Sequence, residues 1–321
     1  MKMIFLLGLL ATTLATTAFS QVGAPDILAK ANASLQAGQA DQTLLLLNSL
    51  PPSAEVHNLR CRVHYALEHW DAAGSECEQA VKMDGQNSLF HMWLGRALGE
   101  KASRASFVNA FSLAKRVCAE FETAVRLDPR NAEALADLGE FYASAPGVVG
   151  GGTDKAEKVA TELDQVDEVR AHELRARIAE GRKDYATAEG EFKKALAVSP
   201  HPAFQWMSIA SYHRRRQEWA QLDSAIDDGI KAAQHDKRAG VALFNGSSVL
   251  TRANRNLPLA AQMLQDYLAG PSLTEEAPAF VAHTRLARIK GQLGDKAAAQ
   301  QERTAALALA SDYKPALDLK F

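Results

Sequence analysis

The sequence predicts an all-α solenoid built from about eight antiparallel helix hairpins. Alanine and leucine dominate the chain and β-branched residues form no alternating runs, which favours helix over strand. Bulky and small residues recur at helical spacing, in segments of about 34 residues, through almost the whole length. Helix breakers such as Pro129 and Pro200 close successive segments.

Length and charge limit the possible classes of protein. The chain has 321 residues, of which 47% are hydrophobic, so it has enough apolar residues for one or two domains with a sizeable core. Its formal net charge is −2, which gives no overall field to attract nucleic acid or an anionic membrane. We therefore expect no nucleic-acid partner.

The first twenty residues have the form of a secretory signal peptide. A short basic start is followed by an apolar run from Ile4 to Leu14, too short to predict a bilayer span. Ala18-Phe19-Ser20 then places small residues at the two positions that a signal peptidase reads. We expect a signal peptide at 1–20, a solenoid over 21–321 that begins at Gln21, and a periplasmic or secreted protein with no transmembrane segment after cleavage.

The repeated units can be aligned with one another. Leu94-Gly95 and Leu138-Gly139 lie in equivalent first helices, and Ala188-x3-Phe192 lies in a second helix that ends at Pro200. Small residues allow two helices to approach closely, and large ones fill the space between hairpins. Together these patterns resemble the tetratricopeptide repeat family throughout the expected mature chain, and this resemblance implies a right-handed superhelix. The units are expected at about 24–52, 54–86, 88–129, 132–165, 169–200, 203–235, 239–270 and 279–315.

Two units depart from the regular length. The third carries extra residues between Gly95 and Phe121, and the fourth carries the glycine-rich loop within 144–156, SAPGVVGGGTDKA. These features closely resemble a group of exported bacterial tetratricopeptide repeat proteins with an APGxVGGG loop, a group from which we carry over no activity.

The glycine-rich loop lacks the essential features of a nucleotide-binding P-loop. Gly147 and Gly152 have the required spacing, but Thr153 stands where lysine is needed, and the preceding segment reads as helix rather than strand. We expect Asp154 and Glu157 to form a capping box at the start of the next helix. A weaker functional interpretation is that free N–H groups at this helix start hold an anion. That candidate site comprises Gly150, Gly151, Gly152 and Thr153.

Searches for catalytic and metal motifs return little. His172-Glu173 begins a zinc-protease motif, but Ala176 occupies the position of the second histidine. The histidines at hairpin positions are interpreted as packing residues. We therefore expect no enzyme activity, no metal site and no cofactor.

Two of the three cysteines are placed symmetrically about one predicted turn. Cys61 lies eight residues before His69 and Cys77 eight residues after it, so an antiparallel hairpin brings the two together. In an exported protein this predicts a disulfide, although two buried thiols would fit the same positions. Cys118 is expected to be a buried free thiol.

The first helix of each hairpin should line the inner surface of the solenoid, where such proteins hold their ligands. A row of arginines with apolar neighbours on this surface suits a peptide with carboxylates. An alternative is that these arginines pair with the chain's own glutamates on a solvated face. The predicted ligand-binding residues are Arg62, Tyr65, Met92, Arg96, Glu140, Arg177, Met207, Arg214 and Arg288.

These observations predict an exported, non-enzymatic scaffold that binds proteins or peptides on its concave face. One alternative is a protein that binds a small anionic or envelope-derived ligand at the glycine loop or the arginine row. Another is an enzyme whose site is assembled from distant residues.

Overall fold

The computed structural model describes residues 23–236, 238–271 and 273–321, so the predicted signal peptide and Gln21 lie outside the described residues. The described residues form seventeen α-helices and one 3-10 helix and contain no strand. Neighbouring helices pack as pairs, which confirms the predicted all-α solenoid. The helices are α1 (Ala24–Gln36), α2 (Ala40–Asn48), α3 (Ala54–Ala66), α4 (Trp70–Met83), α5 (Ser88–Arg104), α6 (Phe107–Leu127), α7 (Ala132–Ser144), η1 (Gly147–Val149), α8 (Thr153–Leu163), α9 (Glu168–Gly181), α10 (Tyr185–Val198), α11 (Pro202–Arg216), α12 (Trp219–Ala233), α13 (Gly240–Ala253), α14 (Leu257–Ala269), α15 (Ala279–Gln292), α16 (Lys296–Leu309) and α17 (Lys314–Leu317).

Small residues allow helices to approach closely, both within a hairpin and between neighbouring hairpins. A Cβ atom added at Gly95 would lie 2.5 Å from the Phe121 ring, and one at Gly139 would lie 2.3 Å from the Leu174 side chain. Both separations are well inside normal contact distance, so glycine is required unless the neighbour moves. The spacing of small and large residues read from the sequence therefore reports real helix contacts.

The helix starts are set by local side chains. Ser53, Asn87, Asn131 and Asp167 each accept a hydrogen bond from a backbone N–H in the first turn of the helix that follows. Side-chain caps of this kind satisfy N–H groups that have no partner inside the helix. They fix where the first helix of these four units begins.

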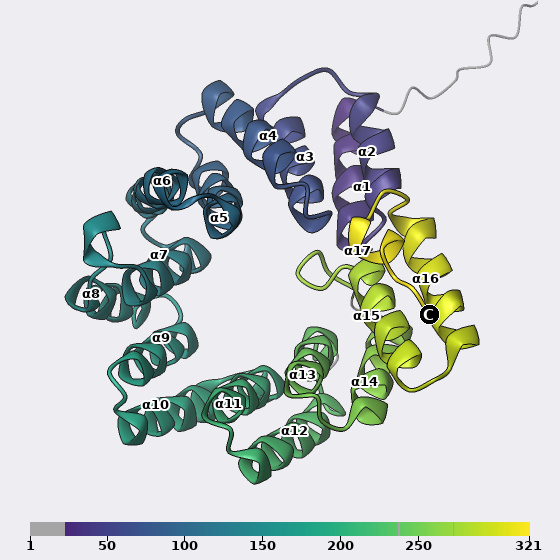
Figure 1. Ribbon diagram of the computed structural model, residues 1–321. Helices are drawn as coiled ribbons and strands as arrows, with labels where there is room; N and C mark the ends of the chain where they lie inside the picture. The colour runs from purple at the N-terminus through teal and green to yellow at the C-terminus, as the bar shows by residue number, and fades with distance from the viewer. Residues whose placement is uncertain (1–22, 237, 272) are drawn as a thin grey trace, which may run out of the picture.

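The solenoid curves until its two ends meet. Figure 1 shows the helices arranged in a ring, with α1 to α3 beside α15 to α17, and with the first helix of each hairpin generally on the inner side. One buried cluster joins residues from both ends, among them Leu35 and Leu67 with Phe280 and Tyr313. Gly38 has φ +67°, and a Cβ atom there would lie 2.4 Å from the Ala279 nitrogen. The ends therefore share one hydrophobic core.

Polar contacts complete this junction. Glu275, in the α14–α15 loop, accepts hydrogen bonds from the side chains of Arg62 and Gln36. The backbone N–H of Ser311 donates to Asp41 over 3.0 Å, and the Tyr313 hydroxyl lies 3.2 Å from Glu68. The ring is thus closed by side chains more than 200 positions apart in sequence.

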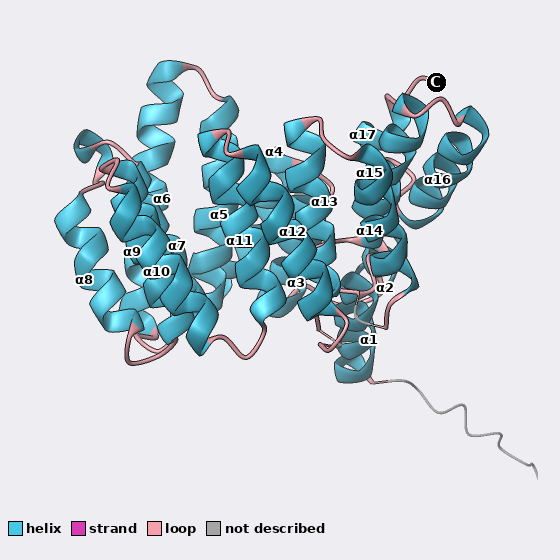
Figure 2. Ribbon diagram, turned by 90° about the horizontal axis from the view of Figure 1, so that it is seen from below, coloured by secondary structure: helices cyan, strands magenta, loops and turns pink. Residues whose placement is uncertain are grey.

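The longer third unit forms a projection. α6 has 21 residues, and the α5–α6 pair stands beyond the neighbouring hairpins in Figure 2. At its tip Phe107 and Val108 are 88% and 76% exposed. The extra residues predicted in this unit therefore extend both helices rather than forming a loop.

Candidate functional site

The inner face of the ring carries two adjoining clefts. The larger, of about 690 Å³, lies mainly between α9, α11 and α13, and the smaller, of about 330 Å³, lies between α7, α9 and α11. Both are lined by Arg170, Glu173, Ser208 and Ser211. Because these residues are shared, the two clefts form one continuous depression along four successive hairpins.

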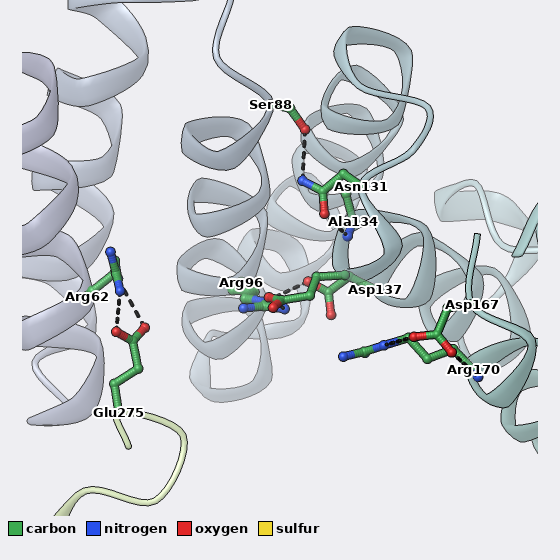
Figure 3. A network of polar contacts seen from close by, with 10 residues as sticks. Arg62, Ser88, Arg96, Asn131, Ala134, Asp137, Asp167, Arg170 and Glu275 are labelled. Carbon is green, nitrogen blue, oxygen red and sulfur yellow. Dashed lines mark hydrogen bonds and ion pairs between the residues drawn. The ribbon is translucent and has the colours of Figure 1, made fainter. Parts of the chain in front are cut away.

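Three of the predicted arginines are already neutralised within the chain. Arg96 donates to Asp137 over 2.6 Å and to Glu133 over 3.1 Å. Arg62 pairs with Glu275, as Figure 3 shows together with the Arg96 contacts. Arg177 lies 3.2 Å from the predicted site residue Glu140 and 3.8 Å from Glu180. We call Arg62, Arg96 and Arg177 the paired arginines, and for them the alternative of internal ion pairs is the correct one.

Aromatic rings support two of the paired arginines. The guanidiniums of Arg62 and Arg96 lie 5.6 Å and 4.9 Å from the Trp93 ring centroid. The predicted site residue Tyr65 meets the edge of the same ring at 5.5 Å between centroids. Burial raises the pKa of Tyr65 to about 12, so its hydroxyl stays protonated at neutral pH. The guanidiniums of Arg62 and Arg96 are therefore held both by a carboxylate and by the Trp93 ring.

The two predicted methionines are core residues. Met92 is 1% exposed and belongs to the hydrophobic cluster around α5 and α6, so its prediction as a ligand-binding residue is wrong. Met207 is 3% exposed and packs against Gly229 and Gly246, although it also forms part of the wall of the larger cleft. Helical spacing places a residue on one side of a helix but does not separate the groove from the adjoining core.

A second group of arginines lacks internal carboxylate partners. Arg214 on α11, Arg252 on α13 and Arg285 on α15 all line the larger cleft. Among the described residues, no carboxylate oxygen lies within 4.0 Å of any of these three guanidiniums. We call them the cleft arginines. Only Arg214 belonged to the predicted set, and the predicted Arg288 is exposed on α15 outside the cleft lining.

The cleft arginines experience one another's charge. Burial lowers the pKa of Arg285 to about 10; Arg252 and Arg288 act in the same direction, and Tyr313 and Glu68 oppose it. Burial also lowers the pKa of Arg214, and Arg252 and Arg215 act in the same direction. The Nε atom of Arg214 is buried and has no hydrogen-bond partner in the described part of the chain. The cluster is therefore a site of uncompensated positive charge.

The floor of the clefts is polar. Glu173 accepts hydrogen bonds from Gln205 and Ser208, each 3.2 Å long, and its burial raises its pKa. Arg170 is paired with Asp167 at 3.2 Å, as Figure 3 also shows. These groups satisfy one another and are not free to act as counter-ions for the cleft arginines.

The glycine-rich loop is a packing element. The N–H groups of Gly150, Gly151 and Gly152 donate to the carbonyls of Gly147, Pro146 and Tyr142. A Cβ atom at Gly151 would lie 1.8 Å from the Ala145 carbonyl oxygen, and one at Gly150 would lie 2.7 Å from the Cys118 sulfur on α6. The glycines are thus required for the turn and for its contact with the long helix of unit three.

This geometry corrects two predictions about the loop. The three glycine N–H groups of the candidate anion site are already used, and the remaining member, Thr153, is the first residue of α8. The N-cap of α8 is Gly152, with no side-chain cap, so Asp154 does not form the predicted capping box. Glycine can take the extended N-cap conformation, and the start of the helix shifts by two residues.

Cys61 on α3 and Cys77 on α4 are joined as a disulfide, with their Cα atoms 5.2 Å apart. The antiparallel hairpin brings both to fully buried positions, as their symmetry about the turn indicated. Cys118 is a buried free thiol. Burial raises its pKa to about 11, with a further contribution from Glu122, so it is a poor nucleophile.

Four histidine–glutamate pairs form a repeated feature that the sequence interpretation missed. In each pair a histidine on the first helix of a hairpin lies 2.6 Å from a glutamate on the second helix. The two residues of a pair are 19 positions apart in three pairs and 29 apart in the longer third unit. This regular spacing is a signal in the sequence from which the pairs could have been predicted. The pairs are His57–Glu76, His91–Glu120, His172–Glu191 and His283–Glu302.

The described residues contain no group of three or more His, Cys, Asp or Glu side chains arranged to hold a metal ion. Within the same ranges, no helix combines the length and apolar character needed to cross a bilayer.

The architecture is similar to that of solved helical-repeat structures. Yeast Tom70 aligns over 96% of this chain and 65% of its own, with a TM-score of 0.58 and 13% identity. A tetratricopeptide repeat protein from Parabacteroides merdae aligns over 84% and 98%, with a TM-score of 0.49 and 13% identity. A thermophilic TPR protein from Thermus thermophilus aligns over 56% and 92%, with a TM-score of 0.46 and 19% identity. No family profile and no curated protein matches the sequence.

At these identities the likeness to Tom70 shows the fold alone. The chain is an all-α, tetratricopeptide-like solenoid.

Proposed function

We propose that this chain is an exported, non-enzymatic scaffold that binds a protein or peptide on the inner face of its ring. The observation that carries the proposal is the continuous depression formed by the two clefts, which spans four successive hairpins. The inner surface of a helical solenoid presents side chains from many repeats to one ligand. An extended segment of a partner would follow the depression from α7 to α13.

Site-specific cross-linking tests where the partner binds. A photo-reactive residue at Ser211, which lines both clefts, should capture a partner in the native cell envelope. The matched control is the same residue at Lys193, which is exposed on the outer helix α10. Capture from both positions alike, or from Phe107 at the projecting tip instead, would place the binding surface outside the clefts.

Export is the second part of the proposal and rests on the predicted signal peptide. N-terminal sequencing of the protein purified from the periplasm or medium should begin at Gln21. An intact Met1 in that material would contradict export by this route.

A second candidate function is the binding of a small anionic or envelope-derived ligand. The unpaired cleft arginines favour it, since they offer charge without an internal counter-ion. Native mass spectrometry of the purified chain distinguishes the two functions. A bound adduct of small mass, without protein cross-links from Ser211, would select the small ligand.

A further inference from the structure

The larger cleft holds three cations and leaves them without internal anions. Arg214, Arg252 and Arg285 come from three different hairpins and line the same cleft. Within the described ranges none has a carboxylate oxygen inside 4.0 Å. Arg285 donates only to the Ser248 hydroxyl and lies 4.0 Å from the Phe244 ring centroid. The packing of three successive hairpins has therefore assembled like charges at one place.

Nearby acidic residues do not compensate for this. Asp167 is bonded to Arg170, and Glu173 accepts from two neutral donors. Glu276 lines the cleft but is exposed and forms no ion pair among the described residues. Arg214 and Arg285 are partly buried, and a partly buried cation without a counter-ion costs free energy, which is characteristic of binding sites rather than of packing. The missing partner is an anion from another molecule.

The rest of the lining limits what that molecule is. Phe204 is partly exposed in the same cleft, and the nearly buried Met207, Phe244 and Val249 form the apolar wall behind it. A volume of about 690 Å³ accommodates several side chains rather than a single inorganic ion. The site therefore suits a ligand that presents acidic groups and an apolar group together.

We propose that the larger cleft binds an internal segment of the partner in which two or more acidic side chains flank an apolar residue. The cleft arginines bind the carboxylates, for which the forked guanidinium is well suited. The apolar side chain packs on the partly exposed Phe204. This inference rests on the proposed protein-binding function and specifies the chemistry of the segment that is bound.

A pair of blocked peptides tests the inference directly. The probe is a fluorescein-labelled, C-terminally amidated hexapeptide of two leucines and four aspartate or glutamate residues. Its neutral twin has asparagine and glutamine instead. Fluorescence anisotropy with the full mature chain should show binding of the acidic peptide at least tenfold tighter than that of its twin. The difference should shrink as salt rises from about 50 to 300 mM, through screening.

Variants locate the binding within the cleft. Arg252→Gln, and separately Arg214→Gln, should weaken the acidic peptide at least fivefold. The matched control is Arg116→Gln, because Arg116 lies on α6 outside both clefts and is paired with Glu78 at 2.7 Å. The control should change affinity less than twofold. Circular dichroism and thermal melting check that each variant folds.

The possible results separate this inference from the proposed function. Equal binding of the two peptides, or equal effects of Arg252→Gln and Arg116→Gln, overturns the inference. Displacement of the peptide by pyrophosphate as efficiently as by unlabelled acidic peptide also overturns it, in favour of a compact anion. Capture of a partner at Ser211 without a preference for the acidic peptide supports the proposed function and overturns the inference. Acidic peptide binding without any capture at Ser211 removes the proposed function and keeps the acidic site.

Discussion

Arginines on the inner face of this ring have two different environments. From α3 to α9, Arg62, Arg96 and Arg177 are each held by a carboxylate of the chain. From α11 to α15, Arg214, Arg252 and Arg285 line a cleft with no such partner in the described residues. The first region also carries the Cys61–Cys77 disulfide. Charge is therefore used for cohesion on one side of the ring and is left available on the other.

The comparison teaches that an arginine row is not by itself a binding surface. Arg96 meets Asp137 because the next hairpin presents a carboxylate at the facing position. Arg252 has arginines as its charged neighbours instead, as the effects on Arg214 and Arg285 show. What decides the role of each arginine is the residue that the adjacent repeat places opposite it.

The largest expected effect concerns the covalent bond in the paired region. Replacing Cys61 and Cys77 together by alanine should lower the free energy of unfolding by about 3 kcal/mol, because the unfolded chain regains the freedom of a closed loop. Chemical denaturation of wild type and variant measures the difference. Thiol titration under denaturing, non-reducing conditions should find one free thiol per chain, that of Cys118. A count of three would show that the bond does not form in the protein.

Arg96 provides the sharpest contrast with a cleft arginine. Arg96→Ala should cost about 2 kcal/mol, because the Asp137 side chain is only 24% exposed and would lose its counter-ion. Arg252→Gln should change stability by less than about 0.5 kcal/mol, since Arg252 is exposed and has no internal partner to lose. Urea unfolding of the two variants in parallel tests the comparison. Similar costs for both would mean that the two regions do not differ.

Glu275→Gln would convert a paired arginine into an unpaired one. The Arg62 and Glu275 side chains are 14% and 12% exposed, so losing the charge should cost about 1–2 kcal/mol. Arg62 would then be free to bind the acidic hexapeptide, and the affinity or stoichiometry of that peptide should rise. Isothermal titration calorimetry measures both quantities. A stability loss without any gain in binding would show that the Arg62 position cannot hold a ligand even when it is vacated.

The smallest effect is a pH dependence within the clefts. Burial raises the pKa of Glu173, so the folded state binds this proton more tightly than the unfolded state. Ionised Glu173 therefore costs stability at neutral pH, and that cost disappears as the pH falls through the raised pKa towards the ordinary value near 4.3. Glu173→Gln keeps an acceptor for Gln205 and Ser208. It should raise the melting temperature at pH 7 and not at pH 4, and an equal shift at both pH values would contradict this account.

Much of the repeat could be predicted from local pattern. Gly95 and Gly139 marked close helix contacts, Pro200 closed its unit, and the extra residues of unit three appeared as longer helices. The spacing of the His–Glu pairs is also present in the sequence, but the sequence analysis interprets these histidines only as packing residues. The predicted capping box was wrong because Gly152 is the N-cap of α8, so Asp154 does not cap the helix. The prediction that Met92 binds a ligand was wrong because one side of a helix can face both the groove and the core.

The sequence by itself determined the class of fold, the number of hairpins and the facing positions of Cys61 and Cys77 about their turn. All of these depend on interactions within one hairpin or between neighbours, which a period of about 34 residues records. Only the tertiary structure decided that the ends meet and that Glu275 reaches Arg62 across 213 positions. It also decided that Arg214, Arg252 and Arg285 meet in one cleft. The meeting of the ends depends on the summed rotation of eight units, and small angles at each junction add up to a geometry that no single repeat encodes. The cleft arginines come together through the packing of three successive hairpins.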